Sequence, residues 1–154
     1  MNSLLGSDSF GLGVMCDKTL KKKLTEYFQN KKEVIAVYLY GSIVTGKAVM
    51  TSDVDIALLT TPYKDMIESQ KTRVRYQTEI SGLIRRDVDL VFLQEAGELL
   101  SLQILSRGQV VFEADKETHR SFRAYRLIKC LDFQFLEDRM KRGMVAAMKE
   151  DIIG

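Results

Sequence analysis

Two aspartates at alternate positions open an apolar segment of the chain and could hold a metal ion. Asp53 and Asp55 stand at the start of the run that continues through residues 56–59. On a β-strand, residues two apart point to the same side, about 6.6–6.8 Å apart along the chain, so the two carboxylates would share a face. Two like charges at the start of a buried strand are costly unless a cation joins them. A hard divalent cation such as Mg²⁺ is the natural partner, because it prefers carboxylate oxygens.

A third carboxylate comes from residues 87–93, where acids again occupy alternate positions at the start of an apolar run. If this strand lies beside the first, one of its acids joins Asp53 and Asp55. We favour Asp89 because it lies inside the apolar run. Asp87 stands at the edge of the run, behind two arginines, where a solvated ion pair would explain it.

A glycine–serine pair directly after residues 34–40 could accept phosphate groups. Glycine at position 41 lets the backbone turn sharply and lets a phosphate approach closely. If a helix begins at Ser42, its free N–H groups face that phosphate, and the serine hydroxyl adds a hydrogen bond. Downstream, Gly46 is a second conformationally permissive position and Lys47 adds positive charge. The residues expected to contact a bound nucleotide are therefore Gly41, Ser42, Gly46, Lys47 and Ser52.

These side chains must be positioned by alternating helices and strands. Periodicity, caps and β-rich runs predict helices over residues 17–29, 62–84, 97–108 and 115–148, strands over residues 34–40, 53–59, 87–93 and 109–113, and a short helix or loop over residues 42–51. Such an alternation predicts one α/β or α+β domain. We expect residues 17–150 to form that domain, and the Gly- and Ser-rich residues 1–16 to be a mobile arm.

Composition excludes several classes of protein. The chain has 154 residues, with 23 Lys and Arg against 21 Asp and Glu, and a net charge of +2 argues against a dedicated nucleic-acid-binding protein. It has no apolar stretch of the roughly 20 residues that a membrane span needs, and its N-terminus lacks the pattern of a signal peptide. We therefore expect a cytoplasmic protein with Cys16 and Cys130 as free thiols and His119 on the surface.

The combination of Gly41-Ser42, ten intervening residues and Asp53-Val54-Asp55, with the later strand acid Asp89, resembles the nucleotidyltransferase superfamily of the polymerase-beta type. The small size, and the stretch over residues 102–115 with the Tyr- and Arg-rich helix after it, are similar to a minimal nucleotidyltransferase (MNT) domain. The similarity covers about residues 17–140. It implies the nucleotidyltransferase fold, a mixed β-sheet of about four strands flanked by helices, with a long C-terminal helix.

The resemblance also implies an activity. Related domains transfer AMP from ATP to a tyrosine of a HEPN-type ribonuclease toxin and act as its antitoxin. In such an enzyme Asp53, Asp55 and Asp89 would bind two Mg²⁺ ions and carry out catalysis, and Asp89 could serve as general base. Two alternatives stay open: an antitoxin that only binds and blocks the toxin, and an adenylyltransferase that acts on a small hydroxyl compound.

The predicted C-terminal helix is apolar around more of its circumference than packing on one side requires. Aromatic residues, Leu and Met recur along residues 122–148, beyond the ~100° that core packing needs. Two interpretations remain: a helix buried on more than one side within the domain, or an interface with another protein, where aromatics and Met are enriched.

Overall fold

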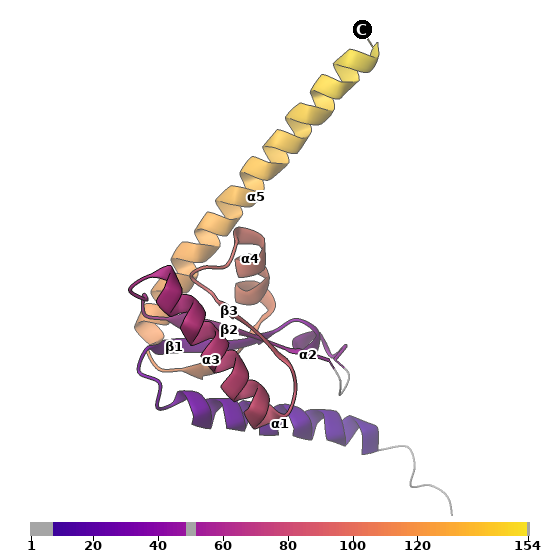
Figure 1. Ribbon diagram of the computed structural model, residues 1–154. Helices are drawn as coiled ribbons and strands as arrows, with labels where there is room; N and C mark the ends of the chain where they lie inside the picture. The colour runs from indigo at the N-terminus through magenta and orange to yellow at the C-terminus, as the bar shows by residue number, and fades with distance from the viewer. Residues whose placement is uncertain (1–7, 49–51, 154) are drawn as a thin grey trace, which may run out of the picture.

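The computed structural model describes residues 8–48 and 52–153, with side chains from Lys18 onward. Five helices and four strands follow one another within these residues (Figure 1). The helices are α1 (Asp8–Phe28), α2 (Ser42–Thr45), α3 (Met66–Ile84), α4 (Glu98–Arg107) and α5 (Lys116–Ile153). The strands are β1 (Val34–Tyr40), β2 (Val54–Thr60), β3 (Val88–Phe92) and β4 (Gln109–Glu113).

The four strands form one mixed sheet in the order β3-β2-β1-β4. Strand β1 runs antiparallel to both β2 and β4, whereas β2 and β3 are parallel. The parallel pair requires a crossover, and α3 supplies it. The predicted four-stranded mixed sheet is confirmed, and the predicted burial of residues 34–40 is confirmed as well, because only Ile35 of β1 is not buried.

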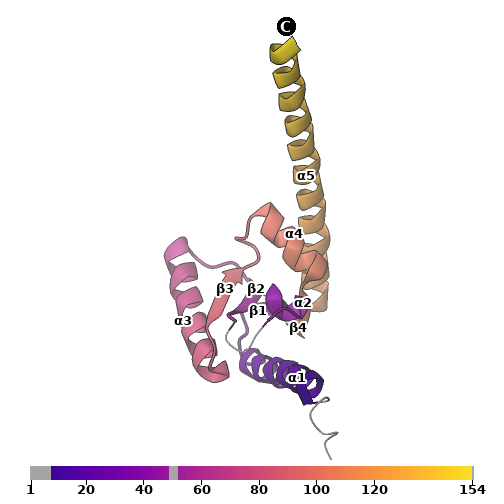
Figure 2. The same ribbon diagram turned by 90° about the vertical axis from the view of Figure 1, so that its right-hand side faces the viewer.

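The two faces of the sheet carry two separate apolar clusters because side chains alternate along each strand. One face presents residues such as Val37, Ile56 and Leu90 to α1 and α3. The other presents Tyr38 and Ala57, among others, to α4 and α5. Figure 2 shows α3 on one side of the strands, α4 and α5 on the other, and α1 below them. The fold is therefore a three-layer arrangement with the sheet in the middle.

Some element boundaries differ from those predicted. Helix α1 begins at Asp8 and not at residue 17, so residues 8–16 of the predicted arm are helical. Helix α3 begins at Met66 and not near Pro62, because Asp65 caps it by accepting a hydrogen bond from the backbone N–H of Glu68 at 2.8 Å. The remainder of the predicted arm, residues 1–7, lies outside the described residues.

The prediction of a surface position for His119 is wrong. Its side chain is 4% exposed and lies between β1, β4 and the first turns of α5. The imidazole Nε2 is hydrogen-bonded to the Tyr38 hydroxyl, and Nδ1 is hydrogen-bonded to the Glu113 carboxylate. A buried polar side chain needs such partners. Glu113 lies only six residues before His119, but Tyr38 comes from β1, 81 residues away in the sequence, so the burial depends on how the strands pack around the helix.

Helix α5 extends well beyond the rest of the domain (Figure 1). Among its described side chains, only His119 and Cys130 are buried, both in the half that packs against α4 and β1. The interpretation as a helix buried on more than one side is therefore wrong for the chain as it stands alone. No helix within residues 8–48 and 52–153 is long and apolar enough to cross a membrane.

Candidate functional site

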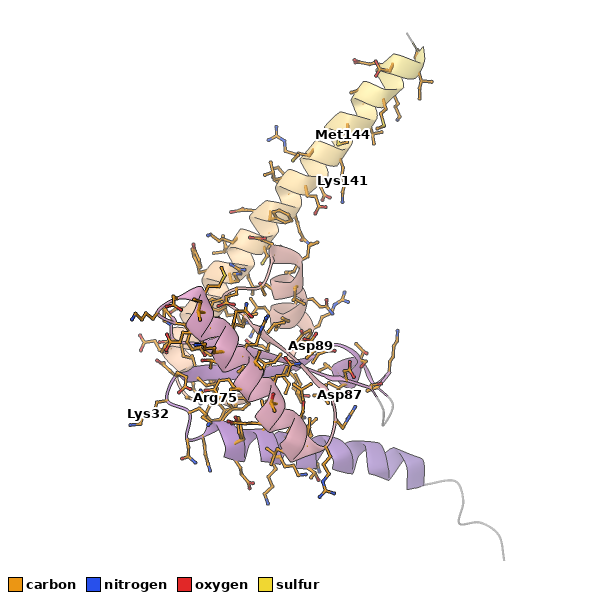
Figure 3. The ribbon with its side chains drawn as sticks, in the orientation of Figure 1. Lys32, Arg75, Asp87, Asp89, Lys141 and Met144 are labelled. Atoms are coloured by element: carbon orange, nitrogen blue, oxygen red, sulfur yellow. The ribbon has the colours of Figure 1, made fainter. Side chains whose placement is uncertain are left out.

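Two of the three predicted acids are cross-strand neighbours in the sheet. Asp55 and Asp89 are register partners in the parallel pair of β2 and β3, so their backbones lie about 4.8 Å apart. Both side chains point to the face of α4 and α5, because Val54 and Val88, one position earlier, lie in the cluster on the opposite face. Asp89 is exposed and Asp55 is half-buried. Figure 3 shows Asp87 and Asp89 at the end of the sheet where α2 lies.

Negative charge is concentrated at this edge of the sheet. Burial raises the pKa of Asp55, and the nearby carboxylates of Asp89 and Asp53 raise it further. Tyr40, which pairs with Asp55 across β1 and β2, has its pKa raised to about 12 by burial and then by Asp55 and Asp89. Sequence reasoning assigned no role to Tyr40, although it ends the strand just before the glycine. These shifts place Asp53, Asp55, Asp89 and Tyr40 in one electrostatic neighbourhood.

Gly41 touches this acid cluster directly. Its backbone has φ 72° and ψ −146°, a conformation that residues with a side chain rarely adopt. A Cβ atom at this position would lie 2.2 Å from Oδ2 of Asp55, well inside van der Waals contact. Position 41 therefore requires glycine for two reasons, the backbone conformation and the space that the Asp55 carboxylate occupies.

The expected helix after Gly41 is a single turn. Helix α2 spans Ser42–Thr45 and ends at Gly46, which has a left-handed backbone (φ 74°) and donates its N–H to the Ser42 carbonyl. The first N–H groups of a helical turn have no acceptor within the helix and point toward its N-terminal side. Ser42 is half-buried there, whereas Lys47 is exposed. The turn thus directs its first N–H groups toward its N-terminal end, where Gly41 lies against Asp55.

Asp53 does not lie within the strand as predicted. Strand β2 begins at Val54, and Asp53 is an exposed residue just before it. Two contacts tie this segment to β3: the Val54 N–H donates to the Asp87 carbonyl at 2.9 Å, and Nη2 of Arg86 donates to the Ser52 carbonyl at 2.6 Å. Arg86 is half-buried, so the prediction of a solvated arginine at this position is wrong. Arg86, just before β3, therefore contacts the segment that carries Asp53, which the sequence pattern alone did not indicate.

The carboxylates of Asp53, Asp55 and Asp89 are ligands of the kind that Mg²⁺ prefers, but they are not arranged around a common point. Among the described residues, no three His, Cys, Asp or Glu side chains are arranged so that they would hold a metal ion. All three aspartates nevertheless offer carboxylate oxygens, and Asp53 and Asp89 lie close enough to Asp55 to raise its pKa. Mg²⁺ is commonly held by one or two carboxylates, with waters and substrate phosphates as its other ligands. The donor set at this edge matches that requirement.

A hollow of about 560 Å³ lies at the far end of β2, away from the acids. Its lining includes Asp65 and Glu68, which serve to cap α3: Asp65 accepts from the Glu68 N–H, and Glu68 accepts from the Lys64 N–H at 2.8 Å. A third lining acid, Glu33, accepts a hydrogen bond from the Tyr76 hydroxyl. These carboxylates stabilise the fold, and the candidate site remains the edge that carries Asp55 and Asp89.

Comparison with known proteins identifies a family. The family model described as "Polymerase beta, Nucleotidyltransferase" matches residues 22–117, well over half of the chain. The matched region contains the glycine–serine turn and all three acids. No curated protein gives a significant match to the sequence.

Several solved structures share the fold. One is a toxin–antitoxin complex with AMP-PNP (23% identity, TM-score 0.62), which covers 83% of this chain and 98% of that chain. Another is the toxin–antitoxin MntA-HepT (21% identity, TM-score 0.59; 85% of this chain and 98% of that chain). A third is a tri-AMPylated Shewanella oneidensis HEPN toxin in complex with an MNT antitoxin (21% identity, TM-score 0.58; 85% and 98%). At these identities the likeness establishes the fold.

Proposed function

The chain belongs to the polymerase-beta-type nucleotidyltransferase family, and from that premise we propose that it is a Mg²⁺-dependent adenylyltransferase antitoxin. It transfers AMP from ATP to a tyrosine of a HEPN-type ribonuclease toxin and so neutralises that toxin. The observation that carries the proposal is the close approach of Gly41 to Asp55, with Asp89 beside Asp55 across two parallel strands. We take residues 17–150 as the catalytic unit and the cytoplasm, where ATP is plentiful, as its location.

The reaction follows from the placement of the residues around this edge. The Gly41–Ser42 turn accepts the β- and γ-phosphates of ATP, because glycine leaves room for the phosphate and the turn supplies N–H donors. Asp53 and Asp55 would hold Mg²⁺, and Asp89 would complete its ligand set. Mg²⁺ held there would neutralise the phosphate charge and lower the pKa of the acceptor hydroxyl.

Bond making and breaking take place at the α-phosphorus. The acceptor oxygen forms a bond to this phosphorus while the bond to the bridging oxygen of the β-phosphate breaks, so that pyrophosphate leaves. Asp89, which is exposed and pairs with Asp55 across β2 and β3, accepts the proton of the hydroxyl. The protein contributes mainly by positioning the reactants and neutralising charge. Ser52 and Lys47 flank the site and would contribute a hydroxyl and a positive charge.

The partner is inferred from a surface and from the comparisons together. Tyr125, Ile128, Leu131 and Phe135 are large apolar residues of α5, each more than half exposed. Such a patch is typical of a protein–protein interface. The antitoxins of similar fold are found in complexes with toxins, one of which is AMPylated. We infer that a HEPN-type toxin binds this patch.

The patch would serve equally an antitoxin that blocks its toxin without modifying it, so the experiment must separate binding from transfer. The protein is incubated with ATP labelled at the α-phosphate, Mg²⁺ and the protein encoded by the adjacent reading frame, with Asp55→Asn as the matched variant. Label on the partner, lost with Asp55→Asn, is the expected result. Neutralisation without label would overturn adenylyl transfer in favour of simple blocking. Label on small hydroxyl compounds only would overturn the choice of a protein substrate.

A further inference from the structure

The outer half of α5 carries a second apolar surface, distinct from the patch around Tyr125. Beyond Cys130, the last buried residue, the helix continues for more than 20 residues without packing on the domain. Figure 3 shows Lys141 and Met144 far from the sheet on this part of the helix. Its exposed apolar residues include Phe133, Leu136, Met140, Met144 and Met148. We call these five residues the outer stripe.

The outer stripe lies along one side of the helix. Its members are spaced by three, four, four and four residues, and with about 100° of rotation per residue they fall within about 120° of the circumference. The same side faces the domain earlier in the helix, where His119 and Cys130 are buried. Ile128, Leu131 and Phe135 of the Tyr125 patch lie on the opposite side of the helix axis, whereas Tyr125 itself lies about 20° around the helix from Leu136. The outer stripe is therefore a largely separate apolar surface with room for an occupant of its own.

We propose that this occupant is a second copy of the chain, packed antiparallel, with a two-fold axis through Met140. In such a pairing Met140 meets its own copy, because a two-fold interface brings the same surface together from both subunits. Leu136 then faces Met144, and Phe133 faces Ala147, a large residue against a small one. Leu136 and Met144 are four residues from Met140, and Phe133 and Ala147 are seven. Residues at these spacings lie on the same side of a helix as Met140.

The charges at the ends of the pairing are complementary as well. Lys129 and Asp151 lie eleven residues before and eleven residues after Met140, again on the same side of the helix. The pairing therefore places Lys129 of each copy opposite Asp151 of the other, twice per dimer. Within its own chain the Lys129 ammonium lies 5.0 Å from the centre of the Tyr125 ring, on an exposed surface that leaves it accessible.

The length of the interface and the rest of the helix surface support a second copy. From Lys129 to Asp151 the helix runs about 33 Å at 1.5 Å per residue, a span of several heptads. The neighbouring side of the outer half carries Lys141, Arg142 and Lys149, which line a shallow hollow together with Val145 and Ala146. Pairing through the outer stripe leaves Ile128, Leu131 and Phe135 of each copy free, because they lie on the other side of the helix. The inference does not rest on the proposed function, since neither ATP nor a toxin is needed for it.

A cysteine on the axis tests the geometry directly. In the full chain with Cys16→Ser, Met140→Cys is compared with Phe135→Cys, which lies on the other side of the helix. Residues joined by a disulfide have Cα atoms about 4.4–6.8 Å apart, a distance that only a residue near the two-fold axis can reach. Under mild oxidation we expect Met140→Cys to be mostly a covalent dimer and Phe135→Cys to stay largely monomeric. Equal cross-linking of the two variants would overturn the proposed register.

A charge exchange tests the same register without cysteines. We expect light scattering to give about twice the mass of one 17.6 kDa chain. Lys129→Asp and Asp151→Lys should each raise the dimer dissociation constant roughly 2- to 30-fold, since two exposed ion pairs are lost, and the double variant should restore it. Met140→Glu should give a monomer with an unchanged circular dichroism spectrum. If the wild-type protein has the mass of one chain even at high concentration, the proposal is refuted. The same holds if the outer stripe is covered only when a partner protein is added.

Discussion

Adding one methyl group at Gly41 tests the geometry on which the candidate site depends. A Cβ on Gly41 would lie 2.2 Å from Oδ2 and 3.1 Å from Cγ of Asp55. The backbone conformation at this position costs a residue with a side chain about 1–3 kcal/mol, and forced overlap in a packed site adds about 1–3 kcal/mol. We therefore expect Gly41→Ala to lower the free energy of unfolding by about 2–6 kcal/mol, and to displace the Asp55 carboxylate.

Gly46→Ala is the matched control for backbone strain. Gly46 also has a positive φ, 74°, but a Cβ there would have no neighbour within 4 Å. Its substitution should cost only the left-handed backbone, about 1–2 kcal/mol. Urea unfolding followed by circular dichroism measures both variants, and transfer of labelled AMP measures activity. We expect Gly41→Ala to be at least tenfold less active than Gly46→Ala, because only Gly41 contacts Asp55.

A double-mutant cycle isolates the contact from the backbone. With Asp55→Ala, the nearest atom to a Cβ at position 41 is the Asp55 Cβ at 3.5 Å, which is an ordinary contact distance. In the Asp55→Ala background, Gly41→Ala should lower the free energy of unfolding only by the cost of the unfavourable backbone conformation, about 1–3 kcal/mol. The reasoning is refuted if Gly41→Ala costs no more than Gly46→Ala, or if its cost is the same with and without the Asp55 carboxylate. The cycle remains measurable even if the single Gly41→Ala variant is poorly stable, because the double variant relieves the overlap.

Three further predictions follow from other contacts. Asp55→Asn should reduce AMP transfer more than about 100-fold. Residues that only orient a metal ligand through a hydrogen bond typically cost about 10–100-fold when they are replaced. The same substitution should stabilise the fold near neutral pH. Burial and the neighbouring carboxylates raise the folded-state pKa of Asp55, so the wild-type protein loses stability as the pH rises through that pKa, and the asparagine variant does not. Comparing the free energies of unfolding of both proteins at pH 4 and pH 8 checks the sign. Tyr76→Phe should cost about 1–3 kcal/mol by removing a hydrogen bond to a carboxylate. Burial alone would raise the pKa of Glu33, but the Tyr76 hydroxyl and nearby cations hold that pKa below its ordinary value. The ionised Glu33 therefore stabilises the fold above its ordinary pKa, and this stabilisation is lost as the pH falls through the folded-state pKa. In Tyr76→Phe the free energy of unfolding should fall less steeply over that acid range. Gly82→Ala, inside α3 with free space at the Cβ position, should raise the free energy of unfolding by about 0.5–1 kcal/mol, measured by urea unfolding.

Local patterns in the sequence were sufficient for much of the fold. The β-rich run of residues 34–40 and the short strand over residues 109–113 have the predicted boundaries, because each is bounded by turn residues and has a strong intrinsic preference. The glycine–serine turn and the spaced aspartates were enough to indicate the family, since their spacing along the chain is itself the pattern. The start of α3 was misplaced because Pro62 and Asp65 are both good starting residues, and only the capping hydrogen bond decides between them.

The tertiary structure alone decided which residues meet. That Asp89 pairs with Asp55 depends on the register of two strands more than 30 residues apart, and that His119 is buried depends on Tyr38 and Glu113 from two other strands. Periodicity along α5 revealed an apolar surface but not whether the domain covers it, because a helix repeats the same side whether or not anything packs there. Residue types and their spacing are properties of the chain, whereas proximity between distant segments arises only when the chain packs.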